Sequence, residues 1–190
     1  MLASITPLGQ RGTRSGWRLT AGSFLIAAAL SGAALGALLG LVGAVVSDRA
    51  RLPLLAGAAL LALALDLSAR TPGPRRQVDE RWRYRYRGWV FGAGYGAQLG
   101  VGVATVVASA ATYLALVGAF LSGAPAGGAL IFGIYGVARG IQPFATRGVS
   151  SPAQLAALHR RLARWQAPGR RAVRASLVAI AALALTGALL

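Results

Sequence analysis

The chain of 190 residues has no cysteine, no lysine, a single histidine and only four acidic residues. The absence of cysteine excludes disulfide bonds, thiol redox chemistry and cysteine ligation of metals within this chain. The histidine, His159, has no cysteine, aspartate or glutamate at ligand spacing, so it is poor evidence for a metal site. No glycine-rich nucleotide loop, Ser/His/Asp set or pair of carboxylates expected to face a cavity can be found. The sequence therefore predicts no catalytic, cofactor or metal site, and a protein that is not an enzyme.

Charge is also scarce and almost entirely of one sign. Charged residues make up 13% of the chain, where a soluble domain has about a quarter, and the mean hydropathy is +0.60. All 20 basic residues are arginine, which gives a net charge of +16. The arginines lie between long uncharged runs, which is the pattern of a polytopic membrane protein and not of a nucleic-acid-binding protein. The exclusive use of arginine, with abundant alanine, glycine and leucine, is typical of a high-GC bacterial genome.

Long apolar runs predict an all-α integral membrane protein with about five transmembrane helices in a single membrane domain. Roughly 20 apolar residues cross about 30 Å of hydrocarbon. The runs that qualify or come close lie at about 20–46, 52–68, 88–121, 129–145 and 173–190. The first run is about twice as long as the apolar region of a secretory signal peptide, so we do not expect it to be one.

The third run is too long for one straight span. Residues 88–121 would form a helix of about 51 Å. Glycines crowd into residues 92–102, and each costs about 1 kcal/mol of helix propensity relative to alanine. We therefore expect a long, broken third helix with a discontinuity near residues 98–103, where other helices or a wet cavity satisfy the backbone. Small residues and a proline predict a loop over 122–128.

The arginines also predict the orientation. Five crossings place 17 arginines on one side, before the first run, between the second and third, and after the fourth. Only Arg49 and Arg51 lie on the other side, while Arg139 falls inside the fourth run. Because the cytoplasmic loops of membrane proteins carry an excess of basic residues, we expect a bacterial plasma-membrane protein with a cytoplasmic N-terminus and an external C-terminus.

Glycines spaced by four form stripes on two of the expected helices. The stripes are Gly32, Gly36 and Gly40 in the first run, and Gly92, Gly96 and Gly100 in the third. Such stripes let another helix approach closely, because packing holds membrane helices together. Either the stripes pack within the chain, or they form a docking face for a partner subunit or a second copy.

Three polar side chains within the apolar runs form the candidate intramembrane site. They are Asp66, Gln98 and Arg139. An ionised side chain costs roughly 2.5–3.5 kcal/mol at mid-membrane, so Arg139 either extends to the headgroups, pairs with Asp66 at a similar depth, or serves transport or a ligand. Gln98 is the best candidate to face a cavity, and a hydrogen bond to the broken backbone is the alternative.

Basic and aromatic residues alternate immediately before the third run. This stretch and one later tryptophan form the expected lipid interface: Trp82, Arg83, Tyr84, Arg85, Tyr86, Arg87, Trp89 and Trp165. Such aromatics settle at headgroup depth, and arginines attract anionic lipids of the cytoplasmic leaflet at about 1 kcal/mol each. The alternation also suits single-stranded nucleic acid, but its place beside a membrane entry point favours an interfacial anchor.

A second interfacial element is expected after the fourth run. Ser151 and Pro152 have the residue types of a helix N-cap and first helical position. Leucines and Trp165 follow on one face, with arginines largely on the others. Residues 152–166 therefore predict an amphipathic helix that lies on the cytoplasmic surface.

Four stretches in order resemble parts of a known membrane family. They are the first span from Thr20 through Gly32 to Gly40, the run 52–67, Gly88-Trp89-Val90-Phe91-Gly92, and Tyr135-Gly136-Val137-Ala138-Arg139-Gly140-Ile141-Gln142-Pro143-Phe144. They resemble the second span, the third span, the approach to a broken fourth helix and the fifth-helix ending in the transmembrane domain of the cytochrome c biogenesis proteins CcdA and DsbD, in the LysE-like superfamily. The resemblance covers most of residues 18–190.

Two departures change what this resemblance implies. The family's first helix, with its cysteine and prolines, has no counterpart, so five spans stand where a three-plus-three inverted repeat has six. The cysteine of the family's broken helix is also missing, because that region reads Gln98-Leu99-Gly100-Val101-Gly102. Family members of this type pass electrons through that cysteine pair, so the resemblance implies a redox-inactive relative.

The expected function is that of a small multi-pass inner-membrane protein acting as a subunit or assembly partner of a membrane complex. Glycine-striped faces and a missing repeat element leave packing surface that a helix from another chain could cover. The alternative is a secondary transporter or exporter of a small solute, which would use the broken third helix and Arg139.

Overall fold

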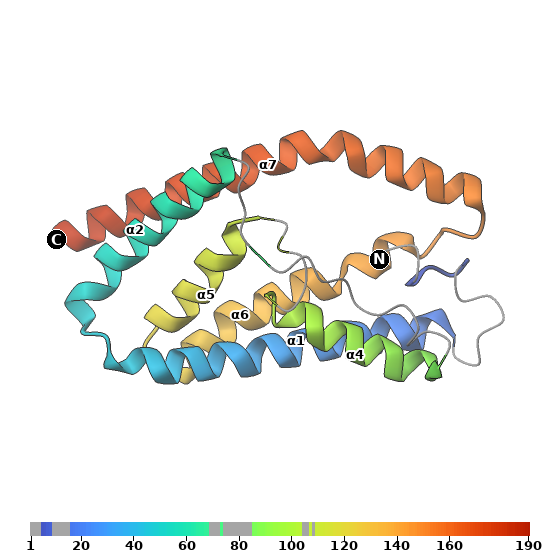
Figure 1. Ribbon diagram of the computed structural model, residues 1–190, viewed down its shortest axis with the longest axis horizontal. Helices are drawn as coiled ribbons and strands as arrows, with labels where there is room; N and C mark the ends of the chain where they lie inside the picture. Colours follow the sequence, from blue (N-terminus) through green and yellow to red (C-terminus); the bar gives the residue numbers. More distant parts are fainter. Residues whose placement is uncertain (1–4, 9–15, 69–72, 74–84, 104–106, 108) are drawn as a thin grey trace.

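The computed structural model describes residues 5–8, 16–68, 73, 85–103, 107 and 109–190. All regular secondary structure in these residues is helical, as the sequence predicts. The elements are α1 (Trp17–Val42), the 3-10 helix η2 (Gly43–Val45), α2 (Asp48–Leu67), α4 (Gly88–Gly100), α5 (Ala111–Leu121), α6 (Pro125–Gly140), the 3-10 helix η3 (Gln142–Thr146) and α7 (Pro152–Leu189). They form an elongated bundle, and α7 runs along most of its length (Figure 1).

Helix α1 packs against α4 through small residues. A Cβ atom on Gly92 of α4 would collide with the carbonyl oxygen of Thr20, and one on Gly96 with that of Phe24. Both residue numbers rise by four along the contact, so α1 and α4 run parallel. The absence of side chains lets the two backbones meet, which is the packing that small residues provide in membrane helices.

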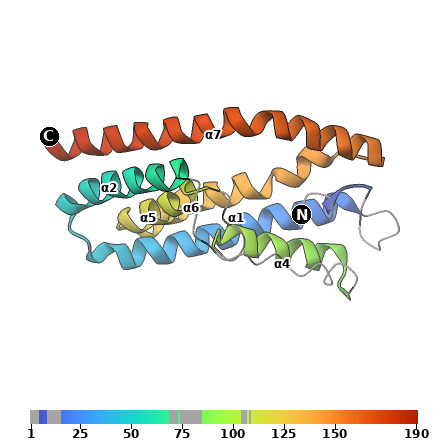
Figure 2. The same ribbon diagram turned by 45° about the horizontal axis from the view of Figure 1, so that its top comes forward.

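Helix α6 packs against α1 in the opposite direction. Gly36 of α1 lies against the carbonyl group of Gly128, and a Cβ on Gly32 would lie 2.6 Å from the carbonyl oxygen of Phe132. The numbers fall along α1 as they rise along α6, so these helices are antiparallel. Helix α1 is therefore the shared element between α4 and α6, as Figure 2 also shows.

The predicted interruption of the third run is present, and it begins directly after Gly100, inside the predicted range of 98–103. Helix α4 continues through its glycines to Gly100, and α5 begins at Ala111. Gly102 has a φ of +77°, a left-handed conformation that glycine adopts without strain. The glycines before it stay helical because their contacts with α1 offset their poor helix propensity.

Helices α2 and α7 form a second group, which α5 connects to the first. Ala59 and Ala62 of α2 share a buried cluster with Leu114 of α5 and with Leu177 and Ala181 of α7. In Figures 1 and 2, α2 lies along the C-terminal part of α7. Helix α2 begins at Asp48, four residues before the predicted run, so Arg49 and Arg51 belong to its first turns.

The prediction of two separate C-terminal helices, over 152–166 and 173–190, is wrong, because α7 is one helix of 38 residues. Its start is as expected: the Ser151 side chain accepts a hydrogen bond from the Gln154 backbone N–H, and the Gln154 side chain accepts one from the Ser151 N–H. Pro168 lies inside the helix and does not end it. Proline removes one backbone hydrogen bond, which strong helix formers on both sides can offset.

The predicted fourth run, 129–145, corresponds to α6 followed by η3. Pro125 occupies the first turn of α6, where its missing N–H costs no helical hydrogen bond. The helix therefore begins four residues before the expected start, and the preceding loop is shorter than predicted. Gln142 to Thr146 continue the chain as the 3-10 helix η3.

Many large apolar side chains point outward from the bundle, and many of its fully buried residues are small. Leu30, Ile134 and Leu183 are 66%, 61% and 72% exposed, whereas Ala28 and Ala59 are fully buried. This distribution suits a protein surrounded by lipid, because a water-soluble protein buries most of its large apolar side chains. By length and composition, α1 with η2, α2 and α7 can each cross a membrane.

Candidate functional site

The helix break is built from residues of three helices. The aromatic ring of Tyr135 in α6 lies against Gly102, and its hydroxyl is 3.3 Å from the Thr112 hydroxyl oxygen at the start of α5. Phe132 stacks on the Tyr135 ring with a centroid separation of 4.7 Å. These contacts fix α6 against both the end of α4 and the beginning of α5. The break is therefore a supported junction in which a tyrosine hydroxyl and a threonine hydroxyl satisfy each other.

Asp66 does not pair with Arg139, so this one of the three alternatives for Arg139 is wrong. Instead, Arg174 of α7 donates from Nε to the Asp66 carboxylate at 2.8 Å and from Nη2 to the Asp66 backbone carbonyl at 3.0 Å. The Asp66 side chain is 10% exposed. The physical reason lies in the packing, because α2 contacts α7 and places its carboxylate on that side.

Arg139 is left without a partner among the described residues. Its Nε atom is buried and makes no hydrogen bond there. Four residues separate Arg139 from Tyr135, so both lie on the same side of α6. A cationic side chain therefore lies one helical turn from the tyrosine that supports the break.

Gln98 lies on α4, two residues before its end, and is half-buried. Within the described part of the chain, Gln98 makes no hydrogen bond, so the expected bond to the broken backbone is not observed there. The three predicted polar residues thus do not form one site: Asp66 belongs to the contact between α2 and α7, while Gln98 and Arg139 lie on α4 and α6. Across the described ranges, no three His, Asp or Glu residues lie close enough together to hold a metal ion.

Both glycine stripes face helices of the same chain. The α1 stripe of Gly32, Gly36 and Gly40 lies against α6 and the loop before it, and the α4 stripe of Gly92, Gly96 and Gly100 lies against α1. Of the two alternatives left open by the sequence, the structure therefore places these glycines in packing within the chain. Neither stripe is available as a docking face in this arrangement.

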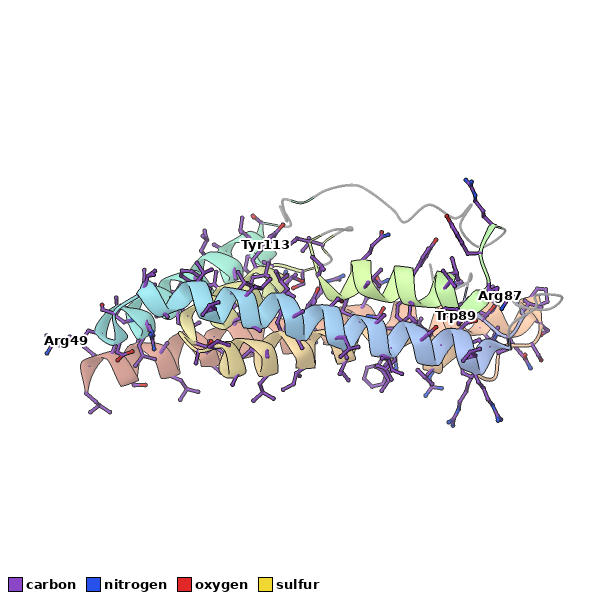
Figure 3. The ribbon with its side chains drawn as sticks, turned by 90° about the horizontal axis from the view of Figure 1, so that it is seen from below. Arg49, Arg87, Trp89 and Tyr113 are labelled. Atoms are coloured by element: carbon purple, nitrogen blue, oxygen red, sulfur yellow. The ribbon has the colours of Figure 1, made fainter. Side chains whose placement is uncertain are left out.

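The expected lipid-interface residues that the structure describes are on the surface. Arg85 and Arg87 are exposed, as are Tyr86 and Trp89 at 46% each and Trp165 at 65%. Figure 3 shows Arg87 and Trp89 at one end of the bundle and Arg49 at the opposite end. Trp82, Arg83 and Tyr84 lie outside the described residues.

A groove that the sequence did not predict lies between the two helix groups. It has a volume of about 560 Å³ and an almost entirely apolar lining from α2, α5, α6 and α7. Residues that line it include Leu55, Ala115, Gly118, Ile131, Val173 and Ile180. A Cβ added to Gly118 would meet no other atom within 4 Å, so this part of α5 borders open space.

Two contacts between helices were not predicted from the sequence. Arg174 stands at the start of the last apolar run and Asp66 near the end of the second, so two antiparallel helices place them at one depth. That signal could have suggested their ion pair. The hydrogen bond between Tyr135 and Thr112 joins residues 23 positions apart and had no comparable signal in the sequence.

No protein-family model, curated protein or solved structure matches this chain.

Proposed function

We propose that the chain is a five-span bacterial inner-membrane protein with a cytoplasmic N-terminus that acts as a subunit or assembly partner of a membrane complex. The observation that carries this proposal is the apolar groove between α2, α5, α6 and α7. Its lining has the small and apolar residues against which membrane helices pack. The occupant we propose is a transmembrane helix of another subunit.

The orientation in this proposal rests on the direction of the helices. Helices α1 and α4 run parallel, while α6 is antiparallel to α1. Arg18 and Arg87, which precede α1 and α4 or begin them, then lie at the same end as Arg147, which follows η3. This agreement supports a cytoplasmic assignment for that end under the positive-inside rule. In this arrangement α4 and α5 together make one broken span.

The groove can be blocked without disturbing the fold. Because Gly118 borders open space, Gly118→Leu adds side-chain volume to the groove and leaves intrachain packing intact. The matched control is Gly57→Leu, since a Cβ on Gly57 also meets nothing within 4 Å but lies on α2 outside the groove lining. We expect Gly118→Leu to remove a co-purifying membrane subunit in mild detergent, while Gly57→Leu retains it. Both variants should melt within about 2 °C of the native protein. Equal retention by both variants, or no associated subunit with the native protein, would contradict the proposal.

A second candidate is a secondary transporter of a small solute, and one observation favours it. The partnerless Nε of Arg139 lies one turn from Tyr135, which contacts the break at Gly102. Broken helices and intramembrane cations are recurring components of transporter sites. A small anion that raises the melting temperature of the native protein, but not of Arg139→Gln, would favour this candidate. Arg49→Gln, at the opposite end, is the control.

We also propose that the chain is a redox-inactive relative of the CcdA and DsbD transmembrane fold. The feature that supports this relation is the interruption between α4 and α5, because the resemblance requires a broken helix at that point. The chain itself has no cysteine with which to carry electrons.

A further inference from the structure

A basic cavity lies at the end of the bundle where α1 begins and η3 ends. It has a volume of about 780 Å³ and is lined by Pro7, Gly16, Trp17, Arg18, Phe144 and Arg147. These residues come from three parts of the chain, which meet because α1 and α6 are antiparallel. The cavity is separate from the helix break and from the apolar groove.

The cavity walls are held in place by specific contacts. The Trp17 indole packs edge-to-face on Phe144 with ring centroids 5.8 Å apart, and its Nε1 donates a hydrogen bond to the Ile5 carbonyl at 3.1 Å. The buried Thr146 hydroxyl oxygen lies 3.0 Å from the same carbonyl oxygen and 2.7 Å from that of Pro143, so its one hydrogen is shared between these two acceptors. Leu8 N–H donates to a backbone carbonyl after η3. Residues 5–8 therefore bind this end of the bundle and complete the cavity.

Two positive charges border this cavity without a compensating carboxylate in the described part of the chain. The acidic residues described are Asp48, which pairs with Arg51, and Asp66, which pairs with Arg174. Arg18 and Arg147 are exposed, and neither makes an ion pair with a described residue. Two guanidinium groups at one cavity repel each other, and an anion between them relieves that repulsion. Guanidinium groups bind phosphate through paired N–H donors.

The depth of the cavity indicates the source of the anion. Arg18 directly precedes the uncharged run of α1, and Trp17 is an aromatic residue of the type that settles at headgroup level. Leu19 and Ile26 on α1 are 58% and 61% exposed, so apolar surface begins immediately beside the arginine. A phosphate group with attached acyl chains matches this sequence of charged and apolar surface.

We propose that this cavity binds the headgroup phosphate of an anionic phospholipid, with Arg18 and Arg147 as its ligands and Trp17 and Phe144 as its walls. The inference rests on the membrane placement proposed above, in which this end faces the cytoplasmic leaflet. The proposed cavity is a defined lipid site, in contrast to the general attraction between surface arginines and anionic lipids.

Native mass spectrometry of the full chain in detergent tests this proposal, with phosphatidylglycerol and phosphatidylcholine as the two probes. Both lipids carry a phosphodiester, but only phosphatidylglycerol has a net negative charge. We expect the native protein to retain phosphatidylglycerol at least about tenfold more tightly than phosphatidylcholine. Arg18→Gln/Arg147→Gln should lose most of this preference. Arg160→Gln/Arg161→Gln, which removes two exposed arginines of α7, should keep it.

Several outcomes would overturn the site. Equal retention of the two lipids by the native protein excludes a headgroup preference, and an equal loss in both double variants means that net charge alone is responsible. Complete displacement of the lipid by inorganic phosphate assigns the cavity to a free anion.

If the glutamine variant does not fold, the variant Arg18→Lys/Arg147→Lys is the second test. It keeps both charges but loses the paired N–H donors of the guanidinium groups, so it should retain phosphatidylglycerol less tightly. Unchanged retention in the lysine variant contradicts the proposed guanidinium ligands. Because detergent has no leaflets, failure here is distinguishable from a wrong topology.

Discussion

At the scale of single residues, the ion pair between Asp66 and Arg174 holds α7 to α2. Asp66 lies near the end of α2 and Arg174 at the start of the apolar half of α7, where an unpaired charge is costly. Asp66→Asn and Arg174→Gln should each destabilise the protein, and the double variant should recover part of the loss. We expect a coupling energy on the order of 1 kcal/mol in a double-mutant cycle followed by thermal melts in detergent.

Arg139→Gln is the matched control for that cycle. Because Asp66 and Arg139 have no shared contact among the described residues, their substitutions should add to within about 0.5 kcal/mol. A coupling between Asp66 and Arg139 as large as that with Arg174 would contradict the observed pairing.

The same residues show what could and could not be predicted from the sequence. Hydropathy indicates the position of a residue along an apolar run, and it places Asp66 and Arg139 in two such runs. Hydropathy does not indicate which helices are neighbours, because side chains that face lipid and side chains that face another helix are equally apolar. The choice between Arg139 and Arg174 as partner of Asp66 depends on that order. The apolar groove, which requires four helices to be placed together, was unpredictable for the same reason.

At the scale of helices, α1 and α4 approach closely through glycine. A Cβ on Gly96 would collide with the backbone of Phe24, so Gly96→Ala alone forces the helices apart, and Gly96→Leu does so further. We expect Gly96→Leu to lower the folded yield strongly and Gly96→Ala to cost about 1–3 kcal/mol in thermal melts. Gly57→Leu is the matched control. Equal tolerance of leucine at both positions would contradict the packing of α4 on α1.

Helix α7 shows the limit of reading helix ends from proline and glycine. Pro168 and Gly169 stand between an arginine-rich half and an apolar half, which predicts two elements, but the helix continues through them. A straight helix would place residues 154 and 186 about 48 Å apart, whereas a right-angle bend at Pro168 would reduce this to about 34 Å. Because the chain has no cysteine, two introduced cysteines can carry spin labels at Gln154 and Thr186.

We expect a distance distribution near the longer value, measured by pulsed electron paramagnetic resonance. The distance distribution of the labelled native protein should differ little from that of a Pro168→Ala variant, in which the helix regains its backbone hydrogen bond. A main population near the shorter value in the native protein would mean that its arginine-rich half turns onto the membrane surface, as the sequence predicted.

At the scale of the whole molecule, the proposed topology has five crossings that place the arginine-rich end in the cytoplasm. The all-helical fold class and the interruption of the third run could be predicted from composition and hydropathy, because the third run is too long for one straight span. The parallel course of α1 and α4 adds independent support, since it brings Arg18 and Arg87 to one end. An even number of crossings would place the two termini on the same side.

Topology is therefore measured most directly with a phosphatase reporter that is active only outside the cytoplasm. One fusion follows Leu190, and the other is inserted at Gly148, which is exposed and has no atom within 4 Å of an added Cβ. Gly73 is less suitable, because its added Cβ would lie 3.1 Å from Val107. We expect high activity for the fusion at Leu190 and none at Gly148. Activity at Gly148, or its absence at Leu190 in a stably expressed fusion, would contradict the proposed topology.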